Sequence, residues 1–167
     1  SHCNDKIMVI TCTGNYKKNN FFNIVNQIAD FFEGYSNYKI LLSDEYLSND
    51  IKPSLSKNIL TTSFNNCIKD SDLIFSIGGD GTMYEIINGM LKRKDGKTLP
   101  IGLITGGTGN SFMYDVDCLD PIEATQRIVR HQLRPLDIAK VDAAGQLFYA
   151  FNIIGWGLAT DAGRLAE

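Results

Sequence analysis

Short apolar runs rich in β-branched residues alternate with longer segments of helical periodicity along most of the chain. The runs predict strands at residues 6–12, 38–42, 72–77 and 99–105, and the other segments predict helices at 20–32, 59–69, 82–92 and 120–131. Such alternation is typical of βαβ units, in which helices cover both faces of a mostly parallel sheet. We therefore expect an α/β fold, with a three-layer domain built on a parallel sheet.

Two of the predicted helices carry start signals. Thr82 and Glu85 stand three residues apart ahead of an apolar-periodic segment, a spacing that predicts a capping box. Asp120 precedes Pro121 and Glu123, which predicts an N-cap, a proline in the first turn and a glutamate that reaches back to the cap. These signals predict that one helix begins near residue 82 and the other at residue 121.

The pattern changes after Arg134. Residues 135–141 and 147–154 predict two strands, and the turn at Ala144 and Gly145 leaves no room for a helix between them. We expect an α/β domain over residues 1–132 and a β-rich domain that begins at residue 133. Residues 133–167 are too few to complete that second domain.

Composition excludes several classes of function. Of the 167 residues, 44% are apolar, which is enough for a buried core, and the net charge of −3 offers no basic face to a nucleic acid. No apolar run approaches the roughly 18 residues that a membrane-spanning helix needs, and residues 1–6 lack the order of a signal peptide. The four scattered cysteines and two histidines show no metal or disulfide spacing. We expect a cytoplasmic protein with reduced thiols and no nucleic-acid partner.

The sharpest motif is Gly78-Gly79-Asp80-Gly81-Thr82, which directly follows the predicted strand 72–77. Ligands of open α/β sheets bind at the carboxyl ends of strands, where the N-terminus of the next helix offers unpaired amides. Glycines let a phosphate approach those amides. An aspartate beside a phosphate is unfavourable unless it accepts a proton or contacts Mg²⁺. The alternative is an ordinary strand-to-helix turn with a solvated aspartate.

A second glycine-rich segment, Gly106-Gly107-Thr108-Gly109-Asn110-Ser111, follows the next predicted strand. Two such turns at neighbouring strand ends would form a phosphate cradle from opposite sides. Gly102 and Gly107 have the outer spacing of a Walker A loop, but the position of its lysine holds Thr108. A dinucleotide-binding G-x-G-x-x-G motif does not occur either. The two turns therefore predict a phosphate site of another type.

These residues resemble a known family. Gly78-Gly79-Asp80-Gly81-Thr82, then Glu85, Asn88 and Gly89, then Gly107-Thr108-Gly109-Asn110, are similar to the catalytic domain of diacylglycerol and sphingosine kinases. Arg134-Pro135-Leu136-Asp137 and residues 152–161 (NIIGWGLATD) resemble the first strands of the second domain of those enzymes. The resemblance covers about residue 72 to the end. It implies a nucleotide-binding domain of the NAD kinase and diacylglycerol kinase type, followed by the start of a lipid-binding β-sandwich.

The resemblance also implies an activity, an ATP-dependent lipid kinase that uses Mg²⁺ to phosphorylate the hydroxyl of a diacylglycerol or a sphingoid base. Asp80 would be catalytic, acting on the hydroxyl as a base or through the metal. Asp161 would contact the lipid, membrane contact would be peripheral, and no residue is assigned as a metal ligand. The implied nucleotide-binding residues are Gly78, Gly79, Gly81, Thr82, Gly106, Gly107, Thr108, Gly109, Asn110, Thr13 and Gly14.

Two other functions stay open at this point. NAD kinases also carry Gly-Gly-Asp-Gly-Thr on a domain of this kind, although Glu85, Asn88 and Gly89 favour the lipid branch. The chain could instead bind a nucleotide without turnover. In favour of that alternative, the family usually has Asn-Pro after the first strand, whereas this chain has Thr11-Cys12-Thr13-Gly14-Asn15.

Overall fold

The computed structural model describes residues 6–48, 50, 53–106, 117–130 and 133–151. The chain divides into two compact units, Ser1–Leu133 and Arg134–Glu167. Within the described part of the chain, no helix is both long enough and apolar enough to span a bilayer.

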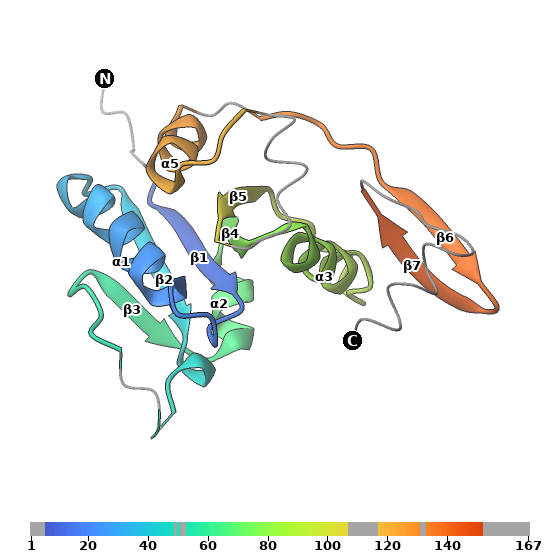
Figure 1. Cartoon of the computed structure of the whole chain (residues 1–167), viewed down its shortest axis with the longest axis horizontal. Helices are drawn as coiled ribbons and strands as arrows, with labels where there is room; N and C mark the ends of the chain where they lie inside the picture. Colours follow the sequence, from blue (N-terminus) through green and yellow to red (C-terminus); the bar gives the residue numbers. More distant parts are fainter. Residues whose placement is uncertain (1–5, 49, 51–52, 107–116, 131–132, 152–167) are drawn as a thin grey trace. The chain divides into compact units, whose positions relative to one another are not determined.

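The first unit is built on a five-stranded sheet in which every paired strand is parallel. The strand order is β3-β2-β1-β4-β5. The strands are β1 (Met8–Gly14), β2 (Tyr38–Ser43), β3 (Ile59–Thr62), β4 (Leu73–Gly78) and β5 (Ile101–Thr105). The chain builds outward from β1 to β3 on one side and then returns to add β4 and β5 on the other (Figure 1).

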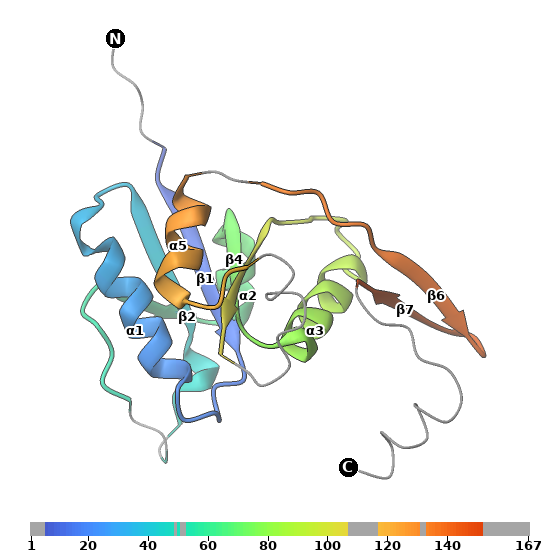
Figure 2. The same ribbon diagram turned by 45° about the horizontal axis from the view of Figure 1, so that its top comes forward.

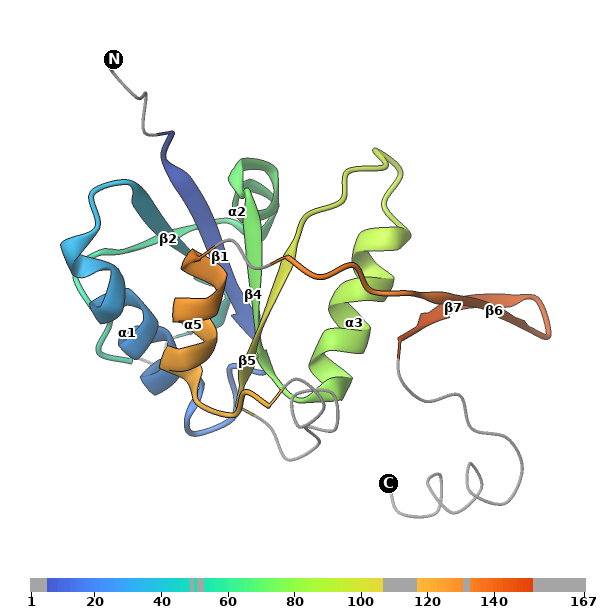
Figure 3. The same ribbon diagram turned by 90° about the horizontal axis from the view of Figure 1, so that it is seen from above.

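Helices cover both faces of this sheet, which confirms the predicted three-layer α/β fold. The helices α1 (Phe21–Phe31) and α5 (Pro121–Val129) lie side by side on one face (Figure 2). The other face carries α2 (Phe64–Asp70) and α3 (Asp80–Leu91), as Figure 3 shows. Short 3-10 turns follow α1 and β2, namely η1 (Phe32–Gly34) and η2 (Asp44–Tyr46).

The core lies between the sheet and α1. Strands β1 and β4 occupy the middle of the sheet, and Ile10, Phe75 and Ile77 on them are at most 2% exposed. The buried face of α1 presents Phe21, Ile24, Val25, Ile28 and Ala29 to these strands. Each large apolar side chain buried in this way contributes about 1.5–3 kcal/mol. This packing fixes the carboxyl ends of β1 and β4 next to each other.

One predicted helix is wrong in its first half. Residues 59–69 were expected to form a single helix, but Ile59–Thr62 is the edge strand β3, paired with β2 from Ile40 to Ser43. Ser63 then caps α2, because its Oγ accepts a hydrogen bond from the Asn66 amide at 3.3 Å. A segment of four residues, Ile-Leu-Thr-Thr, is too short to show a period of its own, so the pairing with β2 decides its conformation.

The predicted capping box at Thr82 is also wrong. Helix α3 begins at Asp80, its N-cap is Gly79, and no side chain caps it. Thr82 and Glu85 are therefore both inside the helix. At α5 the predicted N-cap is confirmed, since Asp120 Oδ2 accepts a hydrogen bond from the Glu123 amide at 2.7 Å. The Glu123 side chain, however, pairs with Arg127 at 2.6 Å, one helical turn along.

The second unit contains an antiparallel hairpin of β6 (Ala139–Ala143) and β7 (Gln146–Ala150). Its turn is the predicted Ala144 and Gly145, with φ of 53° and 81°, as a two-residue turn between twisted strands requires. A short antiparallel sheet after a parallel one fits the start of a sandwich domain. The strand β6 begins at residue 139 rather than 135, and β7 begins at residue 146, next to the predicted 147. The last residues of the predicted second strand, 152–154, lie outside the described residues.

Candidate nucleotide site

The strand order places a crevice between the carboxyl ends of β1 and β4. The chain leaves β1 toward β2 on one side, whereas β4 leads to β5 on the other, so the connections after β1 and β4 diverge. In open α/β sheets ligands bind at such a divergence point. Gly14 ends β1 and pairs in register with Ile77 of β4, so these two strand ends lie directly side by side.

The two glycine turns meet at this edge of the sheet. The Gly106 amide donates a hydrogen bond to the Gly78 carbonyl at 3.3 Å. A Cβ atom built on Gly106 would lie 3.1 Å from Ile77 Cγ2 and 3.3 Å from the Gly78 nitrogen. Only glycine fits this approach without movement of a neighbour. Gly107, Thr108, Gly109 and Asn110 lie outside the described residues.

Gly78 leads directly into helix α3. A Cβ atom on Gly78 would overlap the Thr82 side chain, so the turn from β4 into α3 is as tight as a glycine allows. Gly81 differs, because a Cβ atom there would meet nothing within 4 Å. Gly81 and Thr82 both line the groove described below. The first turn of α3 therefore faces open space with its amides unpaired by any side-chain cap.

Asp80 is the first residue of α3 and is half-buried. A carboxylate in the first turn of a helix interacts favourably with the helix dipole. Asp80 adjoins Gly81, but the groove itself is lined by Gly81, Thr82 and Glu85 from this turn and the next.

Thr13 and Gly14 reach the site from β1. Thr13 and Gly14 line the groove, as does Asn15 after them. Gly14 has a packing role as well, since a Cβ atom there would overlap the Ile77 carbonyl oxygen. The glycine at the end of β1 is thus explained in part by the close approach of β4, which the sequence alone did not indicate.

A tyrosine pair forms the wall next to Thr13. Tyr46 Oη and Thr13 Oγ1 are hydrogen-bonded at 2.7 Å, and the ring of Tyr16 stacks on that of Tyr46 with centroids 4.8 Å apart. Burial raises the pKa of Tyr46, against the opposing effect of hydrogen bonds from Thr13 and the Gly14 backbone. Tyr16 and Tyr46 were not predicted as site residues. Tyr46 reaches the groove from η2, which follows β2, so it belongs to no motif near Thr13 in the sequence.

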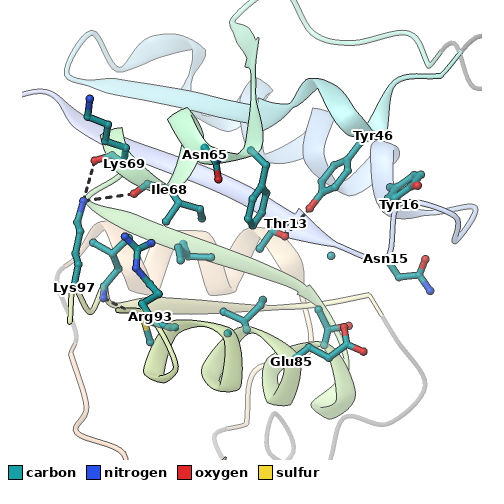
Figure 4. Close-up of a pocket in the computed structure, with 18 of the residues that line it drawn as sticks. Thr13, Asn15, Tyr16, Tyr46, Asn65, Ile68, Lys69, Glu85, Arg93 and Lys97 are labelled. Atoms are coloured by element: carbon teal, nitrogen blue, oxygen red, sulfur yellow. Dashed lines mark hydrogen bonds between the residues drawn. The ribbon is translucent and has the colours of Figure 1, made fainter. Parts of the chain in front are cut away.

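A groove of about 1320 Å³ runs from this edge across the face of the sheet that carries α2 and α3 (Figure 4). Phe64 and Asn65 of α2 line one side, and Glu85 of α3 lies opposite Asn15 near the glycine turns. The apolar lining comes from Ile68, Ile74, Ile86, Met90 and Leu99. An apolar floor with polar and charged side chains at the ends is typical of a site for a small organic ligand that carries charge.

Cations line the groove toward both of its ends, with Lys17 and Lys18 directly after Asn15 and Tyr16 and a larger group at the end remote from the glycine turns (Figure 4). Lys69, Arg93, Lys94 and Lys97 line that end, together with the single acid Asp95. Figure 4 shows Arg93 and Lys97 at the opposite end from Thr13 and Asn15. None of these residues was predicted as part of the site, since their separation from Asp80 along the chain gives no signal in a motif.

Metal binding by protein groups alone is not favoured in the described ranges. No three histidine, cysteine, aspartate or glutamate side chains there cluster closely enough to hold a metal ion. Mg²⁺, however, is usually held by one or two carboxylates together with substrate phosphates and water. Asp80, at the start of α3 beside Gly78, Gly79 and Gly81, could be one such carboxylate.

Three cysteines lie within the described residues. Cys12, Cys67 and Cys118 are buried and free of disulfides. Burial, with a smaller effect of Cys67, raises the pKa of Cys12 to about 12. A thiol that stays protonated is a poor nucleophile. Asp161, the predicted lipid contact, lies outside the described residues.

Known proteins resemble this chain in sequence and in structure. Residues 26–141 match the family described as diacylglycerol kinase catalytic domain. Sphingosine kinase 1 of Arabidopsis thaliana is 35% identical over 100 residues, which is 54% of this chain and 20% of that protein. A Staphylococcus aureus protein named as a lipid kinase is 35% identical over 94 residues, 56% of this chain and 29% of that protein. The chain thus spans less than a third of these relatives.

The structure of yeast NADH kinase complexed with NADH is similar, with a TM-score of 0.55 and 14% sequence identity. The similarity covers 89% of this chain and 45% of that one, and shows a shared fold. The family match covers most of the first unit and extends into β6, and it includes the glycine turns and Asp80. The chain belongs to the diacylglycerol kinase catalytic domain family.

Proposed function

We propose that this chain carries the nucleotide-binding part of an ATP-dependent lipid kinase that phosphorylates the hydroxyl of a diacylglycerol or a sphingoid base. The observation that carries the proposal is the meeting of Gly78 and Gly106 beside the uncapped N-terminus of α3. A helix N-terminus without a side-chain cap favours a polyanion through its dipole, each charge gaining about 0.3–1 kcal/mol.

The nucleotide phosphates would lie on the turn formed by Gly78, Gly79, Gly81 and Thr82. Gly106, Gly107, Thr108, Gly109 and Asn110 would hold them or the ribose from the neighbouring strand. The base would enter the groove between α2 and α3, where Ile68 and Ile86 supply apolar contacts. Thr13 and Gly14 would close the site from β1. The roles of Gly78, Gly106 and Gly14 are supported by their position at the same edge of the sheet, and those of Gly107, Thr108, Gly109 and Asn110 by the sequence alone.

Asp80 would accept the proton of the attacking hydroxyl. The hydroxyl oxygen forms a bond to the γ-phosphorus, the bond from that phosphorus to the β,γ-bridging oxygen breaks, and ADP leaves. A bound Mg²⁺ would neutralise charge on the phosphates, and Asp80 could act through that metal instead of as the base. Phosphoryl transfer requires alignment and charge neutralisation more than covalent help, so it does not require a nucleophilic side chain.

The lipid would be bound mainly by a β-rich domain that begins in the second unit, with Asp161 as one contact. The relatives named as sphingosine kinase and lipid kinase match at the same 35% identity, so they favour neither class of lipid. Membrane contact would be peripheral.

A transfer assay tests the proposal. The full-length protein is incubated with Mg²⁺, γ-labelled ATP and, separately, diacylglycerol, sphingosine, ceramide and NAD. We expect labelled product from diacylglycerol or sphingosine. Product from NAD alone would replace the lipid kinase by an NAD kinase. ATP binding without any product would leave a nucleotide-binding domain that lacks turnover.

A further inference from the structure

The segment between α3 and β5 fastens the groove at its far end. It follows the last turn of α3 at Lys92 and enters β5 after Pro100. Arg93 and Lys97 from this segment face the groove opposite the C-terminal turn of α2 (Figure 4). The segment therefore lies where it can join the two helices that form the groove walls.

The first set of hydrogen bonds lies within the segment and centres on Asp95. Arg93 Nε donates to Asp95 Oδ1 at 2.8 Å, and Arg93 Nη2 pairs with Asp95 Oδ2. The Lys97 amide donates to the same Asp95 Oδ1 at 3.1 Å. Gly96 has a φ of 65°, the left-handed conformation that lets the chain turn back between Asp95 and Lys97. Hydrogen bonds from Arg93 and the Lys97 backbone lower the pKa of Asp95, so this carboxylate stays ionised at neutral pH.

The second link crosses to α2. Lys97 Nζ donates to the Lys69 carbonyl at 2.9 Å and to the Ile68 carbonyl at 3.5 Å. These carbonyls belong to the last turn of α2, whose carbonyl groups have no partner within the helix. A cation at a helix C-terminus is favoured by the dipole. The ammonium thus completes α2 from the opposite side of the groove.

This bridge matters because α2 is a weak wall by itself. It has seven residues and buries only Cys67, and an isolated helix of that length is not stable in water. Phe64, Asn65 and Ile68 of α2 all line the groove. The hydroxyls of Thr11 and Ser71 donate to the Cys67 carbonyl at 3.2 and 2.6 Å and hold α2 to the sheet. Lys97 adds the tie from the α3 side of the groove, at the last turn of α2.

We propose that Lys97 is a positioning residue for the nucleotide base, since its bridge from the end of α3 to the end of α2 fixes the width of the groove. This inference rests on the proposed nucleotide site, and it assigns to Lys97 no contact with the phosphates. Loss of the bridge weakens binding of the base and leaves the phosphate end unchanged.

The test compares two ligands that share only the phosphate end. Calorimetry on the 167-residue chain measures dissociation constants for ATP and for inorganic tripolyphosphate, with Mg²⁺ present. In Lys97→Met we expect the dissociation constant of ATP to rise about three- to tenfold, the cost of immobilising one or two side chains when ATP binds. The dissociation constant of tripolyphosphate should stay the same. Lys97→Arg, which keeps a cation that can donate to both carbonyls, restores ATP binding. Lys92→Met is the matched control, an exposed lysine of the same segment outside the groove.

Each alternative outcome is distinct. Unchanged ATP binding in Lys97→Met, or an equal loss for both ligands, overturns the role of Lys97. A parent chain that binds neither ligand refutes the proposed nucleotide site itself. If Lys97→Met does not fold, Asp95→Asn loosens the same segment, and it must also weaken ATP without weakening tripolyphosphate.

Discussion

The Gly106 amide donates a hydrogen bond to the Gly78 carbonyl at 3.3 Å, which joins the ends of β4 and β5 directly beside the first turn of α3. The contact brings together residues that stand 28 positions apart in the chain. Because Gly14 ends the neighbouring strand β1, three strand ends converge at one edge of the sheet. Substitutions at this edge therefore test both which ligand binds there and which contacts maintain its structure.

Gly78→Ala should destabilise the fold, because its Cβ would overlap the Thr82 side chain. Relief of the overlap requires a shift of the first turn of α3, at a cost of about 1–3 kcal/mol in the free energy of unfolding. Gly81→Ala is the matched control, since its Cβ meets nothing within 4 Å. Urea unfolding of both variants measures the difference. Equal stability of the two would show that the turn is looser than described.

Asp80→Asn should retain nucleotide binding and lose turnover. If Asp80 accepts the hydroxyl proton or holds Mg²⁺, removal of its charge lowers kcat by about 10²-fold or more. Asp70→Asn, at the end of α2, is the control for a lost carboxylate elsewhere. Initial rates with the lipid that the transfer assay identifies, and an ATP dissociation constant, check this. A variant as active as the parent would remove Asp80 from the chemistry.

Stability should fall above pH 10 in a way that depends partly on Tyr46. Burial raises the pKa of Tyr46 above the value near 10 of an unfolded chain, so the folded state holds its proton longer. Stability from this group is complete below pH 10 and is lost as pH rises toward the folded pKa. Urea unfolding at pH 8 and pH 10.5 should show a smaller loss in Tyr46→Phe than in the parent. An identical loss in both would assign the effect to other groups.

Gly89→Ala should stabilise the protein and weaken its binding of ATP. Gly89 is inside α3, lines the groove, and has nothing within 4 Å of a Cβ built on it. Alanine in place of an interior helical glycine gains about 1 kcal/mol. The added methyl group would enter the groove that is proposed to hold the base. Thermal unfolding and calorimetry measure the two effects, and ATP binding as tight as in the parent would mean that the base lies elsewhere.

The sequence predicted the parts of the fold that depend on local pattern. The runs that became β1, β2, β4 and β5 are apolar and bounded by turn residues, and Asp120 with Pro121 marked the start of α5. The strand β3 was not predicted because a segment of four residues acquires its conformation from its pairing with β2. The false capping box at Thr82 has a local origin, since the tight turn at Gly78 starts α3 two residues earlier than the spacing suggests.

The candidate site was also predicted only where a local motif exists. Gly78, Asp80 and Gly106 were predicted because they belong to glycine-rich segments that directly follow strands. Tyr46, Phe64 and Lys97 were not found, because they reach the groove from η2, α2 and the segment before β5. Their place in the site depends on which elements pack together, and a short sequence motif does not contain that information.

The most direct test of the central claim is hydrogen exchange of the backbone amides with and without ATP and Mg²⁺. We expect ATP to slow the exchange of the amides of Gly78, Gly79, Gly81, Thr82 and Gly106, and to leave Asp70 and the edge strand β3 unaffected. Slowed exchange elsewhere, with these amides unchanged at saturating ATP, would contradict nucleotide binding at the glycine turns.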